Sequence, residues 1–251
     1  WQDVNENGFT DAGELKTLTE LGISSINLGY HTVNKKDNFN HITEESTYTK
    51  TDGTKGIIAD VLYAYNKIYT QYGGEYVLSQ ETVDLPWIRG YGQLKDLQLE
   101  ASQNSKLLEI MQTLYNEDNA KIVYDNMDNL LYEWTGANTI DDAEMCGTSS
   151  AKKAYVISKF LNIDLNDITN EQKLYIEEVY KQIKNKTFVD FIAQTKIGNA
   201  FEINYDFVND SIIYNDNTYV KLVSNLTNQD AFFASYLITK VLGMSGALDD
   251  N

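Results

Sequence analysis

The spacing of apolar residues changes along this chain of 251 residues, and that change constrains the fold more than any other feature. Residues 47–50 and 56–65 have the composition of two strands, and the Asp52-Gly53 pair between them favours a tight hairpin turn. From Leu94 onward, leucine and other apolar residues recur at steps of three and four, which is typical of amphipathic helices. We therefore predict an α+β fold, in which a small β-rich unit precedes a mainly helical region.

The predicted boundary between the two regions lies at residues 84 and 85. Residues 1–84 should contain a short helix over Glu14–Leu21, a strand over Ile23–Leu28, a polar loop or hairpin over 31–46, the 47–65 hairpin and a connector over 66–83. Residues 85–251 should be mainly α-helical, with helices after Gly92 and over 105–115, 118–134, 151–161, 171–183 and 231–242. Phe201, Ile203, Tyr205 and Phe207 alternate with polar residues, which predicts a two- or three-stranded antiparallel meander near residues 201–223.

The most specific chemical motif lies at residues 3–14, Asp-Val-Asn-Glu-Asn-Gly-Phe-Thr-Asp-Ala-Gly-Glu. It fits the EF-hand calcium loop at every position that the pattern fixes, including a glycine at the sixth position, Gly8, where the chain must turn sharply. Ca²⁺ takes roughly six to eight oxygen ligands, which such a loop supplies. The predicted metal site therefore comprises six residues, with Phe9 contributing its backbone carbonyl: Asp3, Asn5, Asn7, Phe9, Asp11 and Glu14.

The predicted site should bind calcium weakly. Its formal negative charge comes from Asp3, Asp11 and Glu14, and ligand charge is one of the factors that set affinity, so we expect a Kd on the order of 10⁻⁴–10⁻³ M. Neither an entering helix nor a second EF-hand accompanies the loop. The alternative is an Asn- and Gly-rich turn that precedes a helix, with Glu14 placed in the first turn by the helix dipole.

The composition excludes some classes of function. Acidic residues outnumber basic ones 37 to 20, and the net charge of −17 argues against a nucleic-acid or anionic-membrane partner. No apolar run is long enough for a transmembrane segment. The sequence shows no signal peptide and does not begin with Met, so we expect a piece of a longer protein.

Two further features carry weaker predictions. Cys146 is the single cysteine, so no internal disulfide is possible, and we expect a small, partly buried side chain rather than a nucleophile. Asp141, Asp142 and Glu144 form an acidic run beside glycines. We interpret this run as a solvated turn, and a second cation site is the alternative.

Several segments resemble the RTX family, the haemolysin-type calcium-binding proteins of Gram-negative bacteria, and within it the FrpC-like and fourth-Apx-toxin-like members. The resemblance spans residues 1 to about 135 and is carried by residues 1–18, 21–23, 51–54, 58–61, 85–86, 89–92, 96–97 and 131–134. It implies secretion by a type I system and calcium-dependent folding outside the cell. The Gly-Gly-rich nonapeptide repeats of the family are absent from this sequence. The sequence also contains no Asp-Pro pair, so self-cleavage of the FrpC type is not expected within it.

The leading hypothesis is a non-enzymatic, calcium-binding structural or interaction module of a large secreted RTX toxin or adhesin. A carboxylate-based hydrolase is the alternative, with Asp84, Asp96 and Glu100 beside the Arg89–Gly92 turn as the candidate residues. A third hypothesis is a binding module for a host or bacterial surface component, such as a glycan or a protein, that uses exposed tyrosines.

Overall fold

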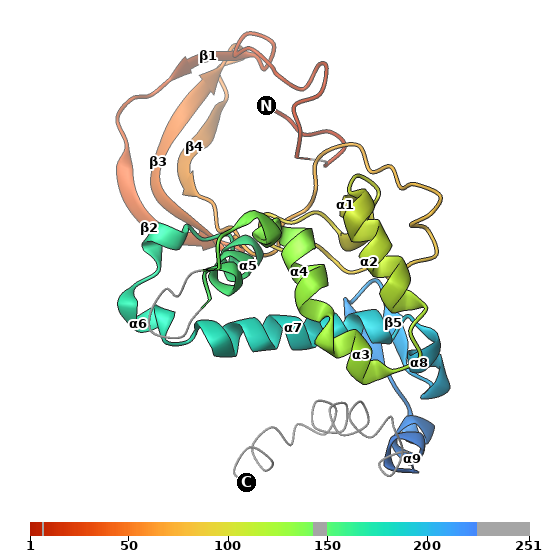
Figure 1. Cartoon of the computed structure of the whole chain (residues 1–251). Coiled ribbons are helices and arrows are strands. Elements are labelled where there is room, and N and C mark those ends of the chain that lie inside the picture. The colour runs from red at the N-terminus through yellow and green to blue at the C-terminus, as the bar shows by residue number, and fades with distance from the viewer. Residues whose placement is uncertain (7, 143–149, 225–251) are drawn as a thin grey trace. The chain divides into compact units, whose positions relative to one another are not determined.

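The computed structural model describes residues 1–6, 8–142 and 150–224, and these form two compact units, Trp1–Asn66 and Lys67–Asn251. The first unit is built of turns and a β-sheet, and the second is mainly helical with a small antiparallel sheet (Figure 1). The α+β fold class is therefore confirmed. The division at Asn66 and Lys67 precedes the predicted boundary at residues 84 and 85, because the predicted connector belongs to the second unit.

The sheet of the first unit is organised around one long strand. Strand β3 (Asn40–Lys50) pairs along one edge with β4 (Lys55–Leu62), and the Asp52-Gly53 turn joins them as predicted. Its other edge pairs with β2 (His31–Asp37) and, further along, with β1 (Ile23–Ile26). All three pairings are antiparallel, so β1 and β2 together form a single interrupted edge.

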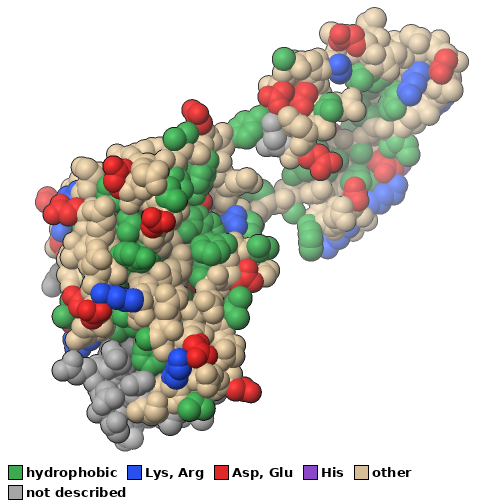
Figure 2. All heavy atoms as spheres, turned by 90° about the vertical axis from the view of Figure 1, so that its right-hand side faces the viewer, with side chains coloured by type: hydrophobic (Ala, Val, Ile, Leu, Met, Phe, Trp, Pro, Cys, Tyr) green, Lys and Arg blue, Asp and Glu red, His purple; other side chains and the backbone are tan. Residues whose placement is uncertain are grey.

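Almost no side chain of the first unit is buried. Among its described residues, Glu14 alone falls in the buried class, and none of the buried hydrophobic residues of the chain belongs to this unit. Large apolar side chains are instead exposed, including Leu28 and Phe39 at 89% each and Ile57 at 68%. The space-filling view shows hydrophobic side chains at the surface among acidic ones (Figure 2). The sheet is therefore held by its backbone ladders rather than by a hydrophobic core.

The predicted helix over Glu14–Leu21 is wrong, because this segment forms a succession of turns. Leu15, Leu18 and Leu21 are 71%, 51% and 45% exposed, so none of them reaches a hydrophobic core that could stabilise a helix. Isolated helices shorter than about 12 residues are marginal in water, so the leucine spacing alone is insufficient. Hydrogen bonds between Thr17 and Glu20 stabilise the turns instead. The N–H and the hydroxyl of Thr17 both donate to the Glu20 carboxylate.

The second unit contains most of the regular structure. Its helices in chain order are α1 (Leu97–Ala101), α2 (Ser105–Tyr115), α3 (Ala120–Asp125), α4 (Met127–Thr135), α5 (Ala151–Leu161), α6 (Asn170–Lys173), α7 (Ile176–Ile192), α8 (Lys196–Ala200) and α9 (Asp216–Ser224). Short 3₁₀ turns lie at Ala137–Thr139 and Leu165–Asp167, and strands β5 (Asn204–Asp206) and β6 (Ser211–Ile213) pair antiparallel. Among the described residues, no helix is long and apolar enough to cross a membrane.

A continuous core lies between α1, α2, α4, α5 and α7 (Figure 1). Its largest fully buried side chains are Leu97, Leu99, Leu107, Met111, Met127, Leu130, Leu131, Phe188, Phe191, Ile192 and Ile203. The helices begin where polar side chains cap them: Asn104 caps α2, Asn119 caps α3 and Ser150 caps α5. The predicted capping box of Thr169 and Gln172 is present at α6.

Three predicted elements of the second unit differ in detail. The helix over 118–134 is broken at Asn126, whose N–H bonds the carbonyls of Ile122 and Val123 and ends α3 before α4 starts. The long helix predicted from Glu171 starts only at Ile176, after the short α6. The meander has two strands, because residues 216–224 form α9 instead of a third strand. The predicted helix over 231–242 and Cys146 lie outside the described residues.

Candidate functional site

Two hydrogen bonds fold the predicted calcium loop back on itself. The Asp3 carboxylate accepts the N–H of Gly8 at 2.8 Å, which closes the first half of the loop. Gly8 has φ +78°, a left-handed conformation that residues with a Cβ adopt reluctantly. The Asn5 side-chain amide donates to the Asp11 carboxylate at 2.8 Å, so the third and ninth loop positions are brought together. Asn7, the fifth position, lies outside the described residues.

Glu14 joins the two ends of the loop and, among the loop residues that the structure describes, is the buried one. Its Oε1 accepts the N–H of Val4 at 2.9 Å, and its Oε2 accepts the N–H of Asp11 at 2.9 Å and the Trp1 indole N–H at 3.2 Å. These donors favour the ionised form, so the pKa of Glu14 is lowered, with the Asp11 N–H as the largest cause and the Val4 N–H next. The loop therefore closes around a carboxylate held in its charged state.

The structure places five of the six predicted ligand residues, all within this closed segment. Their donors are carboxylate, amide and carbonyl oxygens, the chemistry that a hard cation requires. In the described part of the chain, no group of three or more His, Cys, Asp or Glu side chains is arranged to hold a metal ion. In this conformation the Glu14 oxygens contact backbone and indole N–H groups instead.

The acidic run at residues 141–144 is only partly described. Asp142 accepts hydrogen bonds from the Ser150 hydroxyl and from the N–H of Lys152, at the start of α5. Asp142 therefore ties the loop to the first turn of a helix, where a carboxylate also complements the helix dipole. Glu144 lies outside the described residues, and a second cation site here stays a prediction.

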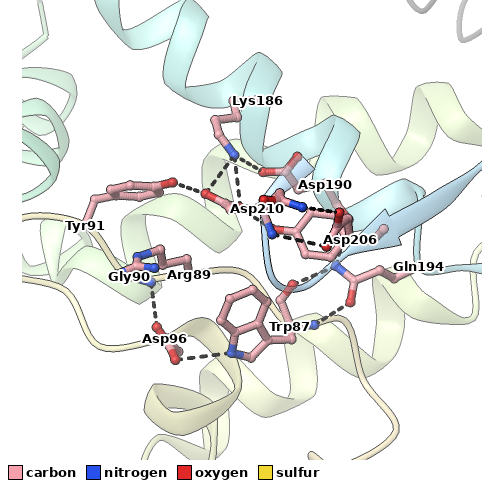
Figure 3. A network of polar contacts seen from close by, with 12 residues as sticks. Trp87, Arg89, Gly90, Tyr91, Asp96, Lys186, Asp190, Gln194, Asp206 and Asp210 are labelled. Atoms are coloured by element: carbon pink, nitrogen blue, oxygen red, sulfur yellow. Dashed lines mark hydrogen bonds and ion pairs between the residues drawn. The ribbon is translucent and has the colours of Figure 1, made fainter. Parts of the chain in front are cut away.

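The three carboxylates considered for hydrolysis have separate surroundings. Asp96 accepts the N–H of Gly90 at 2.8 Å, the Tyr76 hydroxyl at 2.9 Å and the Trp87 indole N–H at 3.2 Å (Figure 3). Glu100 pairs with Lys95 at 3.6 Å. Asp84 lines one cavity and Asp96 lines another. Asp96 thus organises the Arg89–Gly92 turn, because its oxygens bind the Gly90 N–H within the turn and the side chains of Tyr76 and Trp87 before it.

The bond to Asp96 also affects Tyr76. Burial, followed by the hydrogen bond to Asp96, raises the pKa of the Tyr76 hydroxyl to about 12. This hydroxyl is therefore a persistent donor at neutral pH.

A second polar cluster connects α7 with the loop between β5 and β6. Lys186 lies 2.5 Å from Asp190 and 3.4 Å from Asp210, and the hydroxyls of Tyr91 and Tyr205 donate to Asp210 (Figure 3). Burial raises the pKa of both Asp190 and Asp210, while Lys186 opposes the shift at Asp190 and the charge of Arg89 opposes it at Asp210.

Sequence reasoning did not identify this cluster. Tyr91 and Asp210 are 119 positions apart, and only the packing of α7 against the small sheet brings them together. The available signal was the Arg89–Gly92 turn, which contains Tyr91. Nothing in the pattern near Asp190 or Asp210 indicated that either carboxylate would be buried.

Gln194 fixes the position of Trp87. Its amide oxygen accepts the Trp87 backbone N–H at 2.8 Å, and its amide nitrogen donates to the Trp87 carbonyl at 2.6 Å (Figure 3). This reciprocal pair joins the end of α7 to the segment before the Arg89–Gly92 turn. The Trp87 ring is consequently held against Tyr205 and Phe207, with ring centroids 6.0 and 5.9 Å away.

Comparison with known proteins gives a family match and a curated relative. Residues 1–64 match the SPM domain family. The chain is also 33% identical over 135 residues to the iron-regulated protein FrpA of Neisseria meningitidis serogroup C, a match that covers 53% of this chain and 12% of FrpA. The chain therefore spans about one eighth of the length of this curated relative. A relation to FrpA-like proteins is supported over about half of the chain.

Proposed function

We propose that this chain is a calcium-ordered structural module of a large, type I-secreted RTX-type protein, a toxin or an adhesin, which acts outside the cell. The proposal combines the loop at residues 3–14 with the similarity to FrpA. Secretion and the role of the whole protein are inferred from that relative, of which this chain spans a small part.

The observation that carries the proposal is the lack of a hydrophobic core in the first unit. Over residues 1–6 and 8–66, no apolar side chain is buried, and the only side chain in the buried class is that of Glu14. A unit of this size usually needs an extra source of stability, such as disulfides, a metal or a partner surface. The single cysteine of the chain lies outside this unit, so a disulfide is not available. A metal bound by the loop is the source that the local sequence favours.

The loop residues match a hard cation in chemistry, and the left-handed backbone of Gly8 supports the sharp turn that the sixth loop position requires. The side chains of Asp3, Asn5, Asn7, Asp11 and Glu14 and the carbonyl of Phe9 would hold the ion. Bound Ca²⁺ would supply positive charge that offsets the repulsion among three carboxylates. The chain's own contribution is to preorganise the segment, because the Asp3–Gly8 and Asn5–Asp11 bonds already close it. Such a module would stay loosely folded where calcium is scarce and become ordered after export.

Thermal unfolding of the whole chain in calcium and in EGTA tests the proposal. If Kd lies at 10⁻⁴–10⁻³ M, about 10 mM Ca²⁺ should stabilise the first unit by about 1.4–2.7 kcal/mol. For a unit of this size that is a rise in Tm of roughly 5–20 °C. Mg²⁺ at the same concentration should give a smaller rise, because it requires a stricter octahedral geometry.

Two variants separate specific binding from general charge screening. Asp3→Asn removes one loop carboxylate and should abolish most of the calcium-dependent rise. Asp60→Asn removes an exposed carboxylate of β4 in the same unit and should leave the rise intact. An equal Tm in calcium and in EGTA, or an equal rise in both variants, would contradict the proposal.

A further inference from the structure

Two cavities of the second unit share two lining residues, and we refer to the pair of cavities as the groove. One has a volume of about 640 Å³ and the other of about 620 Å³, and both are lined by Tyr76 and Trp87. The first continues toward Gln194, Asn204 and Phe207, and the second continues toward Arg89 and Tyr69. Each cavity has the size of a small-molecule site.

Aromatic rings line the first cavity, and two of them, Tyr76 and Trp87, also line the second. Trp87 packs against Tyr205 and Phe207, whose ring centroids are 5.3 Å apart. Tyr76 and Phe207 remain 47% and 59% exposed, so these rings still present an apolar surface to a ligand. Because Gln194 and Asp96 hold Trp87 at its backbone and at its indole N–H, this platform is rigid. Rigid aromatic platforms bind ring faces with little loss of conformational entropy.

Uncommitted amide groups lie beside these rings. Gln98 is 6% exposed, and its amide nitrogen donates to the carbonyls of Val83 and Leu85. Its amide oxygen has no hydrogen-bond donor among the described residues, although the side chain lines the groove. The side chains of Asn199 and Asn204, also at the groove, make no hydrogen bond with another described residue. A ligand with both donors and acceptors would satisfy such amides.

Arg89, the only arginine of the chain, lies at the other end of the groove. Its guanidinium stacks 3.7 Å from the centre of the Tyr69 ring and donates to the Tyr69 hydroxyl and the Thr70 carbonyl. Its Nε–H is buried and has no acceptor in the described part of the chain. A ligand oxygen could satisfy this donor after a small rotation of the side chain. Asp84 and Asp96 also line the groove, so its charge is not predominantly positive.

We propose that this groove binds a neutral oligosaccharide, with sugar rings stacked on Trp87, Tyr76 and Phe207 and with hydroxyl groups bound by Gln98, Asn199, Asn204 and Arg89. Sugars combine apolar C–H faces with hydroxyls that both donate and accept, which matches this mixture of rings and amides. A purely apolar ligand would leave the amides unsatisfied, and an anionic one would face Asp84 and Asp96 within a chain of net charge −17. The inference concerns the second unit and does not depend on calcium binding by the first.

The test is to apply the labelled 251-residue chain to a glycan array that carries neutral and acidic oligosaccharides, with calcium present. The neutral glycan that binds best is then titrated calorimetrically. Tyr76→Ala and Phe207→Ala should each weaken its binding about tenfold, because each removes one stacking contact. A tenfold loss of affinity corresponds to about 1.4 kcal/mol of binding free energy. Tyr175→Ala removes a comparably exposed aromatic side chain at the end of α6 and should leave the affinity unchanged.

Circular dichroism and thermal unfolding of each variant check that it is folded, as expected for side chains that are 47%, 59% and 60% exposed for Tyr76, Phe207 and Tyr175. Binding of a neutral glycan that is lost in both groove variants and kept in Tyr175→Ala supports the proposal. The absence of neutral-glycan binding, binding confined to acidic glycans, or binding that survives both groove variants would overturn it. None of these outcomes bears on the calcium response of the first unit.

Discussion

Replacing Asp96 with alanine should destabilise the second unit by about 2–4 kcal/mol. Three donors converge on this carboxylate: the Gly90 N–H at 2.8 Å, the Tyr76 hydroxyl at 2.9 Å and the Trp87 indole N–H at 3.2 Å. Gly90 is buried, so its N–H would lose its acceptor without gaining water, at a cost of about 1–3 kcal/mol. Tyr76 and Trp87 are partly exposed, so water replaces part of their lost bonds and they add about 1 kcal/mol together.

Denaturant unfolding monitored by tryptophan fluorescence measures this difference, because Trp87 and Trp134 both lie in the second unit. Asp118→Ala is the matched control, since Asp118 is 84% exposed and its 2.6 Å ion pair with Lys196 should be worth at most about 1 kcal/mol. Asp96→Asn keeps one acceptor and should fall between the two. If Asp96→Ala costs no more than Asp118→Ala, the role of Asp96 as the organiser of the turn is refuted.

Two other predictions concern single positions. The pKa of Glu14 lies below its ordinary value of 4.5 in the folded state, so the ionised carboxylate stabilises the loop above pH 4.5, and this contribution is lost as the pH falls through the folded-state pKa. Glu14→Gln should therefore remove part of the loss of stability below pH 4.5 in an acid titration followed by circular dichroism, and an unchanged profile would contradict this. Gly92 has φ +63°, and a Cβ there would overlap the Lys159 carbonyl oxygen, so Gly92→Ala should cost about 2–4 kcal/mol in denaturant unfolding. Gly136→Ala, at φ +81° with open space around it, should cost only about 1 kcal/mol, and equal costs would show that overlap is not the cause.

The sequence predicted elements well where the signal is local. The bounds of α2 and α5 match the predicted helices, because three- and four-residue apolar spacing coincides there with the caps Asn104 and Ser150. The β3–β4 hairpin follows from its Asp52-Gly53 turn. The helix predicted over Glu14–Leu21 did not form, because its leucines are not buried in a core, and no local pattern reveals whether a core will cover them.

The candidate sites also differ in whether a local sequence pattern could predict them. The loop at residues 3–14 is contiguous, so its side chains could be named before its conformation was known. The groove and the Lys186 cluster join residues from distant segments, as in the Trp87–Gln194 pair, which is 107 positions apart. Predicting such sites requires the packing of α7 against the segment before α1, and that packing depends on many weak contacts rather than on a motif.

The two units draw their stability from different sources, and this contrast explains why calcium would matter to one of them. The second unit buries a continuous apolar core, so its folding does not require a ligand. The first unit has backbone ladders and a buried carboxylate but no buried apolar side chain among its described residues. An ion that binds only the folded loop would contribute a large fraction of that unit's small stability. If the loop binds calcium as proposed, the ion should therefore shift the stability of the first unit and leave that of the second unit unchanged.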